Sequence, residues 1–293
     1  MLGAALKAMR PHQWVKNLFV LAPLLFARQL LVLDVALRSL GGLVTFCLAS
    51  SAIYVFNDLQ DLEQDRLHPT KRHRPIASGR LPAHAAWVLF WGLLAASLLF
   101  GFLLCWKFGL VVVGFLLLNV AYTLRLKRIV FLDVLSIATS FILRVIGGGM
   151  VVTIHLSGWL ILCTLLLATF LGLGKRKHEL LSAIQDPGKQ RKVLASYRRE
   201  SLDILLLLVA TATMAAYIFY TIADSTLHTF NGPRLQFTIP AIMLGIMRFL
   251  QLVDRQADAT SPTEAMLKDP LFLLSVLAWT GMVITFLYLP RGG

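Results

Sequence analysis

A run of polar residues at positions 57–65 ends a long apolar stretch and carries the strongest sign of chemistry in the sequence. Asp58, Asp61 and Asp65 are spaced i, i+3 and i+7, so a helix places their carboxylates on one face, with Asn57 beside them. Like charges at this spacing repel, and an apolar environment screens the repulsion poorly. Sparse oxygen ligands of this kind suit Mg²⁺ shared with substrate phosphates. We therefore expect all four residues to bind Mg²⁺ and the three aspartates to be catalytic. The alternative is a solvated acidic helix end.

The composition places this motif in a membrane protein. Of the 293 residues, 57% are hydrophobic and 15% are charged, and the mean hydropathy is +0.73, whereas a soluble chain carries about 25% charged residues. The net charge of +13 is compatible with nucleic-acid binding. However, the basic residues fall in short loops between apolar runs, where membrane topology accounts for them. We expect no nucleic-acid partner.

Nine apolar runs approach the roughly 17–25 residues that a membrane-spanning helix requires. They cover residues 18–34, 36–56, 84–105, 108–124, 130–153, 157–174, 202–223, 235–253 and 270–290. Most of the 28 lysines and arginines fall in alternating loops on one side, which the positive-inside rule assigns to the cytoplasm. The prediction is one all-α transmembrane domain over residues 1–293, with its N-terminus and the carboxylate motif at the cytoplasmic face of a bacterial inner membrane.

Basic and aromatic residues accompany the carboxylate motif on the same predicted face. A cationic loop beside a Mg²⁺ site is what a polyphosphate substrate requires, since metal and cations divide the phosphate oxygens. For each cluster the alternative is an ordinary topology signal. The candidate phosphate-binding residues are Lys16, Lys71, Arg74, Tyr122, Lys127, Arg128, Asp133, Arg144, Lys175 and Arg176.

One of these candidates, Arg144, lies deep within an apolar run. Asp133, Ser140 and Arg144 follow one stripe of the predicted helix over residues 130–153. An unpaired guanidinium inside a membrane is costly. Arg144 is therefore expected to face either a buried carboxylate or an anionic group of a substrate, and the sequence leaves both open.

Over essentially the whole chain, these features resemble the UbiA superfamily of intramembrane prenyltransferases. Asn57-Asp58-x-x-Asp61-x-x-x-Asp65 matches the first acidic motif of that family, which binds the Mg²⁺-complexed diphosphate of the donor. Tyr122 and Lys127 match the loop between its fourth and fifth helices. The resemblance implies nine helices around a central cavity capped by cytoplasmic loops. The second Asp-rich motif of the family is replaced here by Lys175-Arg176-Lys177-His178-Glu179.

Within that superfamily, the sequence is similar to the decaprenyl-phosphate phosphoribosyltransferase branch. The matching segments are Arg10-Pro11-x-Gln13-Trp14-x-Lys16-Asn17, the loop from Lys71 to Gly79, Leu126-Lys127-Arg128-x-x-x-Leu132-Asp133 through Arg144, and Lys175-Arg176. This resemblance implies Mg²⁺-dependent transfer of 5-phosphoribose from phosphoribosyl diphosphate (PRPP) to a polyprenyl (decaprenyl) phosphate, with release of diphosphate. The product would be a lipid-linked precursor of arabinose units for cell-envelope polysaccharide.

Two alternative functions stay open. A UbiA-type prenyltransferase would move a prenyl group from prenyl diphosphate to an aromatic or haem acceptor. It would need a second metal site, for which Glu179 and Asp186 are available at an unsuitable spacing. A transporter would fit an intramembrane arginine and a cytoplasmic acidic cluster, but nine spans do not divide into equal inverted repeats.

Overall fold

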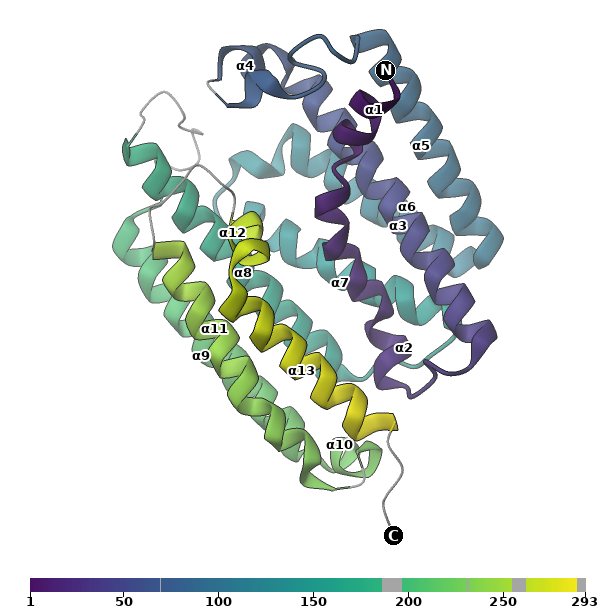
Figure 1. The fold of residues 1–293 in the computed structure, drawn as a ribbon, viewed down its shortest axis with the longest axis vertical. Coiled ribbons are helices and arrows are strands. Elements are labelled where there is room, and N and C mark those ends of the chain that lie inside the picture. The colour runs from purple at the N-terminus through teal and green to yellow at the C-terminus, as the bar shows by residue number, and fades with distance from the viewer. Residues whose placement is uncertain (69, 186–196, 231, 255–261, 289–293) are drawn as a thin grey trace. The chain divides into compact units, whose positions relative to one another are not determined.

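The computed structural model describes residues 1–68, 70–185, 197–230, 232–254 and 262–288, with the backbone alone for residues 182–185 and 262–264. All regular structure in these residues is helical. Contacts divide the chain into two compact units (Figure 1). Unit 1 comprises Met1–Lys127 and Thr139–Leu156, and unit 2 comprises Arg128–Ala138 and Ser157–Gly293. Helix α7 (Leu132–Val152) contributes residues to both units.

Eight helical segments of the described residues are long and apolar enough to cross a membrane. They match eight of the nine predicted runs, and the chain is a multi-pass membrane protein. These segments are α3 (Leu33–Gln60), α5 (Ala83–Leu104), α6 (Trp106–Leu124), α7, α8 (Gly158–Gln185), α9 (Arg199–Ile222), η6 (Pro233–Thr238) with α11 (Ile239–Asp254), and α13 (Pro270–Tyr288). The shorter elements are α1 (Leu2–Met9), η1 (Pro11–Leu21), α2 (Ala22–Phe26), α4 (Leu62–Leu67), η2 (Lys71–His73), η3 (Leu126–Arg128), α10 (Asp224–Thr229) and α12 (Pro262–Lys268).

The first predicted run, residues 18–34, is not one continuous α-helix. It consists of the end of the 3-10 helix η1 followed by α2, which has Pro23 in its first turn. Arg28 adopts a left-handed backbone conformation with φ of 59°, which an α-helix does not accommodate. Proline and a left-handed residue within six positions therefore divide this apolar run into short elements.

In unit 1, α3 packs against α5, α6 and η1, and Figure 1 shows α3, α5 and α6 side by side. The core here is aromatic. The ring of Phe46 meets those of Phe108 and Phe115 edge to face, with centroids 5.8 and 5.2 Å apart. Such contacts stabilise a pair by about 0.5–1.5 kcal/mol beyond the buried area. They hold α3, which carries the carboxylate motif, against α6.

A glycine run lets α7 approach η1 closely. A Cβ atom on Gly148 would lie 2.0 Å from the carbonyl oxygen of Val20. Because residues three apart in a 3-10 helix share one face, Asn17 lies on the same face of η1 as Val20. Arg144 stands one turn before Gly148 on α7. The close crossing therefore brings Asn17 and Arg144 together.

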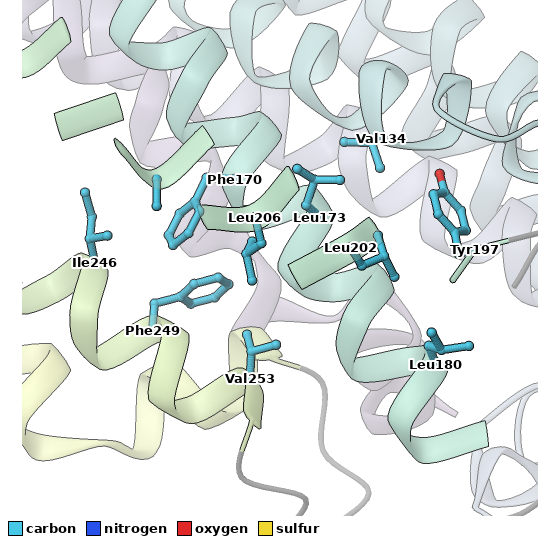
Figure 2. Close-up of a cluster of buried hydrophobic side chains, with 11 residues drawn as sticks. Val134, Phe170, Leu173, Leu180, Tyr197, Leu202, Leu206, Ile246, Phe249 and Val253 are labelled. Carbon is cyan, nitrogen blue, oxygen red and sulfur yellow. The ribbon is translucent and has the colours of Figure 1, made fainter. Parts of the chain in front are cut away.

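In unit 2, helices α8, α9 and α11 pack around a cluster of buried apolar side chains (Figure 2). Phe170 of α8 and Phe249 of α11 lie with ring centroids 4.8 Å apart. A Cβ atom on Gly174 would lie 2.5 Å from the Phe249 ring, so glycine is required for this helix contact. The cluster holds the end of α8 beside the start of α9. Basic and acidic side chains gather at these ends, which are predicted to face the cytoplasm.

The α7–η1 crossing predicts a large effect of one methyl group. Gly148→Ala should lower the free energy of unfolding by about 3 kcal/mol, the upper end of the usual cost of overpacking, because the new Cβ meets backbone that cannot rotate away. The melting temperature (Tm) of the purified protein measures this. Gly114→Ala in α6 is the matched control, since a Cβ there meets no atom of the described structure within 4 Å. Equal Tm values for the two variants would contradict the proposed crossing.

Candidate active site

The carboxylate motif spans the junction between α3 and α4. Asn57 and Asp58 lie in the last turn of α3, Asp61 joins the two helices, and Asp65 lies in α4. Helical hydrogen bonds continue across the junction. The Asp61 amide donates to the Asn57 carbonyl at 2.9 Å, and the Asp65 amide donates to the Asp61 carbonyl at 2.8 Å. The shared face predicted from the i, i+3, i+7 spacing is therefore kept although α3 ends at Gln60.

The two buried carboxylates of the motif face arginines. Oδ1 of Asp58 accepts hydrogen bonds from Nη2 of Arg10 at 2.5 Å and from Nη1 of Arg74 at 3.1 Å. Nη1 of Arg74 also donates to Oδ2 of Asp65 at 2.6 Å. Asp58 and Asp65 are both buried, so each needs a partner charge to stay ionised. The arginines relieve the repulsion that the spacing alone would create.

Residues at the end of α6 and in η3 contact the rest of the motif. Nζ of Lys127 lies 3.0 and 3.3 Å from the two carboxylate oxygens of Asp61, whose side chain is 30% exposed. The Thr123 hydroxyl contacts Oδ1 of Asn57. The predicted phosphate ligand Lys127 is thus the counter-ion of a predicted metal ligand.

Local backbone geometry positions both arginines. Arg10 is left-handed with φ of 54°, which ends α1, and Pro11 then begins η1. Its guanidinium also lies over the Tyr54 ring, 5.2 Å from the centroid. Arg74 precedes Pro75 and is extended, with φ of −62° and ψ of 148°, as a residue before proline prefers. The prolines thus end the preceding helical turns at the residues that bind Asp58.

These residues fit a divalent cation that enters together with an anion. Carboxylate and amide oxygens are the ligands that Mg²⁺ prefers. Yet among the described residues no three acidic, histidine or cysteine side chains lie close enough together to hold a metal ion. Arg10, Arg74 and Lys127 form ion pairs with the carboxylates instead. The three aspartates and three cations balance in charge. A metal alone would leave the cations uncompensated, whereas a metal with a diphosphate would supply partners for both sets.

Arg144 has no carboxylate partner among the described residues. It is buried in α7, where its Nε donates to Oδ1 of Asn17 at 2.7 Å. Its Nη1 donates to the carbonyl and hydroxyl oxygens of Ser140 at 2.8 and 2.9 Å. The guanidinium carbon lies 4.7 Å from the centroid of the Phe115 ring. Of the two partners predicted for Arg144, the buried carboxylate is therefore not found in the described part of the chain.

Asp133 and Arg176 come together within unit 2. Both are fully buried, and Nε of Arg176 lies 3.3 Å from Oδ2 of Asp133. Nη1 of Arg176 also donates to Glu179 at 2.6 Å. Tyr197 completes the cluster, because its hydroxyl donates to Oδ1 of Asp133 at 2.7 Å and accepts from the Phe131 amide. Burial raises the pKa of Tyr197 to about 12, so the hydroxyl stays protonated and donates. Arg176 is thus compensated by protein carboxylates.

Lys177, the next residue along α8, is compensated in the same way. Its Nζ lies 2.6 Å from Asp203 of α9 and also forms an ion pair with Asp254 of α11. These three residues and Arg199 line a cavity of about 400 Å³ above leucines of α9 and α11. The basic run after the sixth predicted span therefore ties α8 to its neighbours in unit 2.

The remaining predicted site residues lie on separate elements, half-buried or exposed. They are Lys16 on η1, Lys71 on η2, Tyr122 on α6, Arg128 on η3 and Lys175 on α8. Of the carboxylates considered for a second metal site, Glu179 pairs with Arg176, and Asp186 lies outside the described residues.

Asn17 and Thr123 were missing from the predicted site residues, whereas Arg10 was already singled out by the segment that begins with it. Both Arg10, which precedes Pro11, and Asn17 stand in the basic segment before the first run. Nothing in the sequence pairs Asn17 with Arg144, 127 positions away. Thr123 could be found only through its spacing of four from Asn119, which places both on one face of α6.

Comparisons with known proteins concern the sequence and the fold of the chain. The model of the UbiA prenyltransferase family matches residues 17–276. The decaprenyl-phosphate phosphoribosyltransferase of Corynebacterium glutamicum is 35% identical over 292 residues, which are 97% of this chain and 86% of that protein. The protein of the same name from Mycolicibacterium smegmatis is 34% identical over 98% of this chain and 93% of its own length.

A solved structure has the same fold. The UbiA homologue from Archaeoglobus fulgidus bound to DMAPP and Mg²⁺ matches with a TM-score of 0.69 at 17% identity, over 96% of this chain and 99% of that chain. At this identity the likeness concerns the fold. It confirms the predicted all-helical architecture.

The buried pair in unit 2 predicts a difference between two neighbouring cations. Arg176→Met removes the charge between two carboxylates, one of them fully buried, and should cost about 3–5 kcal/mol of stability. Lys175→Met changes a half-buried cation one position earlier and should alter the Tm far less. Thermal unfolding of both purified variants gives the comparison. If the two variants have the same Tm, Arg176 does not stabilise unit 2.

Proposed function

Because the chain belongs to the UbiA prenyltransferase family, we propose that it uses the carboxylate motif to bind a diphosphate donor, and that this donor is PRPP. The transfer moves 5-phosphoribose to a polyprenyl phosphate and releases diphosphate. The relatives named decaprenyl-phosphate phosphoribosyltransferase, at 34–35% identity over nearly the whole chain, support this choice. The product is a lipid-linked precursor for arabinose units of the cell envelope.

The observation that carries the proposal is the charge-balanced network around Asp58. Arg10, Arg74 and Lys127 each lie against a carboxylate in unit 1. A diphosphate offers these cations new partners and frees the carboxylates for Mg²⁺. Bound there, Mg²⁺ would neutralise charge that develops on the leaving diphosphate. We propose Asn57, Asp58, Asp61 and Asp65 as its ligands.

The chemistry needs few protein groups beyond these. As the C1–O bond to diphosphate breaks, the ribose passes through an oxocarbenium-like state, and a phosphate oxygen of the lipid bonds to C1. The lipid phosphate is already an anion at neutral pH, so no general base is required. The protein's task is to hold two polyanionic substrates in contact, which cations accomplish. Lys16, Lys71 and Tyr122 of unit 1 are proposed as further phosphate contacts, and Arg128 and Lys175 of unit 2 stay predictions from the sequence.

The basic run after the sixth predicted span supports this donor over a prenyl diphosphate. Arg176 pairs with Asp133 and Glu179, and Lys177 pairs with Asp203 and Asp254. These four carboxylates are therefore committed to protein cations, and Arg176 and Asp133 serve packing within unit 2. The proposed site faces the cytoplasm of a bacterial inner membrane, where PRPP is supplied in solution and the polyprenyl tail stays in the bilayer.

A paired assay tests the function. Membranes that contain the protein receive radiolabelled PRPP with polyprenyl phosphate, or prenyl diphosphate with 4-hydroxybenzoate, each with Mg²⁺. We expect labelled lipid in the first reaction alone, detected by extraction into organic solvent. Product in the second reaction alone would replace the proposal with an aromatic prenyltransferase.

One substitution tests the carboxylates. Asp61→Asn keeps the shape of the side chain and removes its charge, and we expect turnover to fall at least about 100-fold, the scale on which one preorganised electrostatic contact acts. The protein should remain folded, because the Asp61 side chain is 30% exposed. Asp34→Asn, at the opposite end of α3 in an exposed pair with Arg38, is the control and should keep full activity. Full activity of Asp61→Asn would remove Asp61 from the metal site.

The balanced charges also predict that metal and diphosphate bind together. Mn²⁺, as a spectroscopic substitute for Mg²⁺, should bind the purified protein at least about tenfold more tightly with pyrophosphate than without it, since each tenfold step requires only 1.4 kcal/mol. Arg74→Gln should strengthen binding of Mn²⁺ alone, because Asp58 and Asp65 lose a competing cation. Arg80→Gln in the same loop is the control. Equal Mn²⁺ affinity with and without pyrophosphate in the unmodified protein would contradict the coupling.

A further inference from the structure

Arg144 and its surroundings form a second polar site in unit 1, deeper along α3 than the carboxylate motif. Ser50 lies eight residues before Asp58 on α3, about 12 Å along a helix that rises 1.5 Å per residue. Its hydroxyl donates to Oδ1 of Asn17 at 3.1 Å. Nη2 of Arg144 reaches that hydroxyl only at 3.5 Å, beyond the usual range of about 2.7–3.2 Å. One edge of a buried guanidinium is therefore weakly bonded.

The groups around Arg144 are all neutral. Asn17 also donates from Nδ2 to Sγ of Cys47 at 3.3 Å, which fixes its amide with the oxygen toward Arg144. A carboxylate at position 17 could accept the same bond from Nε and compensate the charge. The chain has an amide there instead, so a full positive charge stays uncompensated by described residues inside a membrane-spanning helix. Such a charge is tolerated only when an anion binds to it or when polar contacts offset the cost of its desolvation.

A chain of polar contacts joins this site to the carboxylate motif. The Ser140 hydroxyl, bonded to Arg144, lies 3.5 Å from Nδ2 of Asn119. The Thr123 hydroxyl lies 2.8 Å from the Asn119 carbonyl and also contacts Asn57. Polar groups inside a membrane domain gather along substrate paths. All of these residues belong to unit 1, so Arg144 stands at the inner end of a row of neighbouring polar groups.

We propose that Arg144 and Ser50, with Asn17 positioning the guanidinium, bind a phosphate monoester group that lies deeper than the diphosphate. This inference rests on the proposed function, in which two such groups take part: the 5-phosphate of PRPP and the phosphate of the lipid acceptor. Arg144 supplies the charge, and the Ser50 hydroxyl turns from Asn17 to donate to a phosphate oxygen. The site distinguishes substrates by requiring an anion at this depth, which a prenyl diphosphate does not carry.

Binding of three probes to purified protein tests the site and separates the two sources. The probes are Mg²⁺ with pyrophosphate, Mg²⁺ with PRPP, and a short-chain polyprenyl phosphate. In Arg144→Met, affinity for pyrophosphate should be unchanged. Affinity for one of the other two should fall about 10- to 150-fold, the value of one charged hydrogen bond. Loss for PRPP identifies the 5-phosphate, and loss for the lipid identifies the acceptor phosphate.

Asn17→Asp keeps the test decisive if Arg144→Met folds poorly. The new carboxylate accepts from Nε of Arg144 in place of the amide oxygen, so the Tm without ligand should hold or rise, while the same probe loses affinity at least tenfold. Arg38→Met, an exposed arginine at the far end of α3, should bind all probes normally. Unchanged affinities in both variants overturn the phosphate site. They leave the proposed function standing if the unmodified protein binds PRPP and transfers phosphoribose, whereas failure of the unmodified protein removes the function itself.

Discussion

The buried carboxylate of Asp58, held by two guanidinium groups, is the contact on which unit 1 depends. An ionised carboxylate in an apolar helical domain is costly unless it is paired. Arg10 and Arg74 supply the pair at 2.5 and 3.1 Å. They come from the N-terminal segment and from the loop after α4, so one acidic side chain joins three separate parts of the chain. The same need for compensation explains why Arg74 reaches on to Asp65 and why Lys127 meets Asp61.

Arg144 and Arg176, the two buried arginines among the described residues, illustrate opposite solutions to the same cost. Arg176 lies against Asp133 and Glu179, so carboxylates of the protein compensate its charge. Arg144 lies against an amide, hydroxyl groups and an aromatic ring. These neutral groups satisfy most of its hydrogen bonds, but they do not compensate its positive charge. Compensation by fixed carboxylates suits a structural contact, because it is always present. Neutral partners suit a site whose counter-charge arrives with a ligand.

Much of the fold could be predicted because membrane helices are recognisable one at a time. Apolar runs of sufficient length gave eight spans, and helical periodicity placed Asp58, Asp61 and Asp65 on one face. The first run differs because Pro23 and the left-handed Arg28 interrupt it, and both residue types already mark it in the sequence as the weakest of the nine runs. Residue type likewise marked Arg144 as unusual. Its partners could not be predicted, since Asn17 and Ser50 reach it only through the crossing of η1 and α7.

The 3-10 geometry of η1 sets how this segment can change in length. Three residues complete each turn, so Trp14, Asn17 and Val20 lie along one edge, where they contact Ser51, Arg144 and α7. Inserting or deleting one residue between Arg10 and Asn17 turns every later side chain by about 120°. Asn17 would then face away from Arg144 while Arg10 still faced Asp58. Adding a whole turn of three residues keeps Asn17 on the same face but moves it about 6 Å along the helix, at about 2.0 Å per residue, so the two contacts together fix the length of this segment.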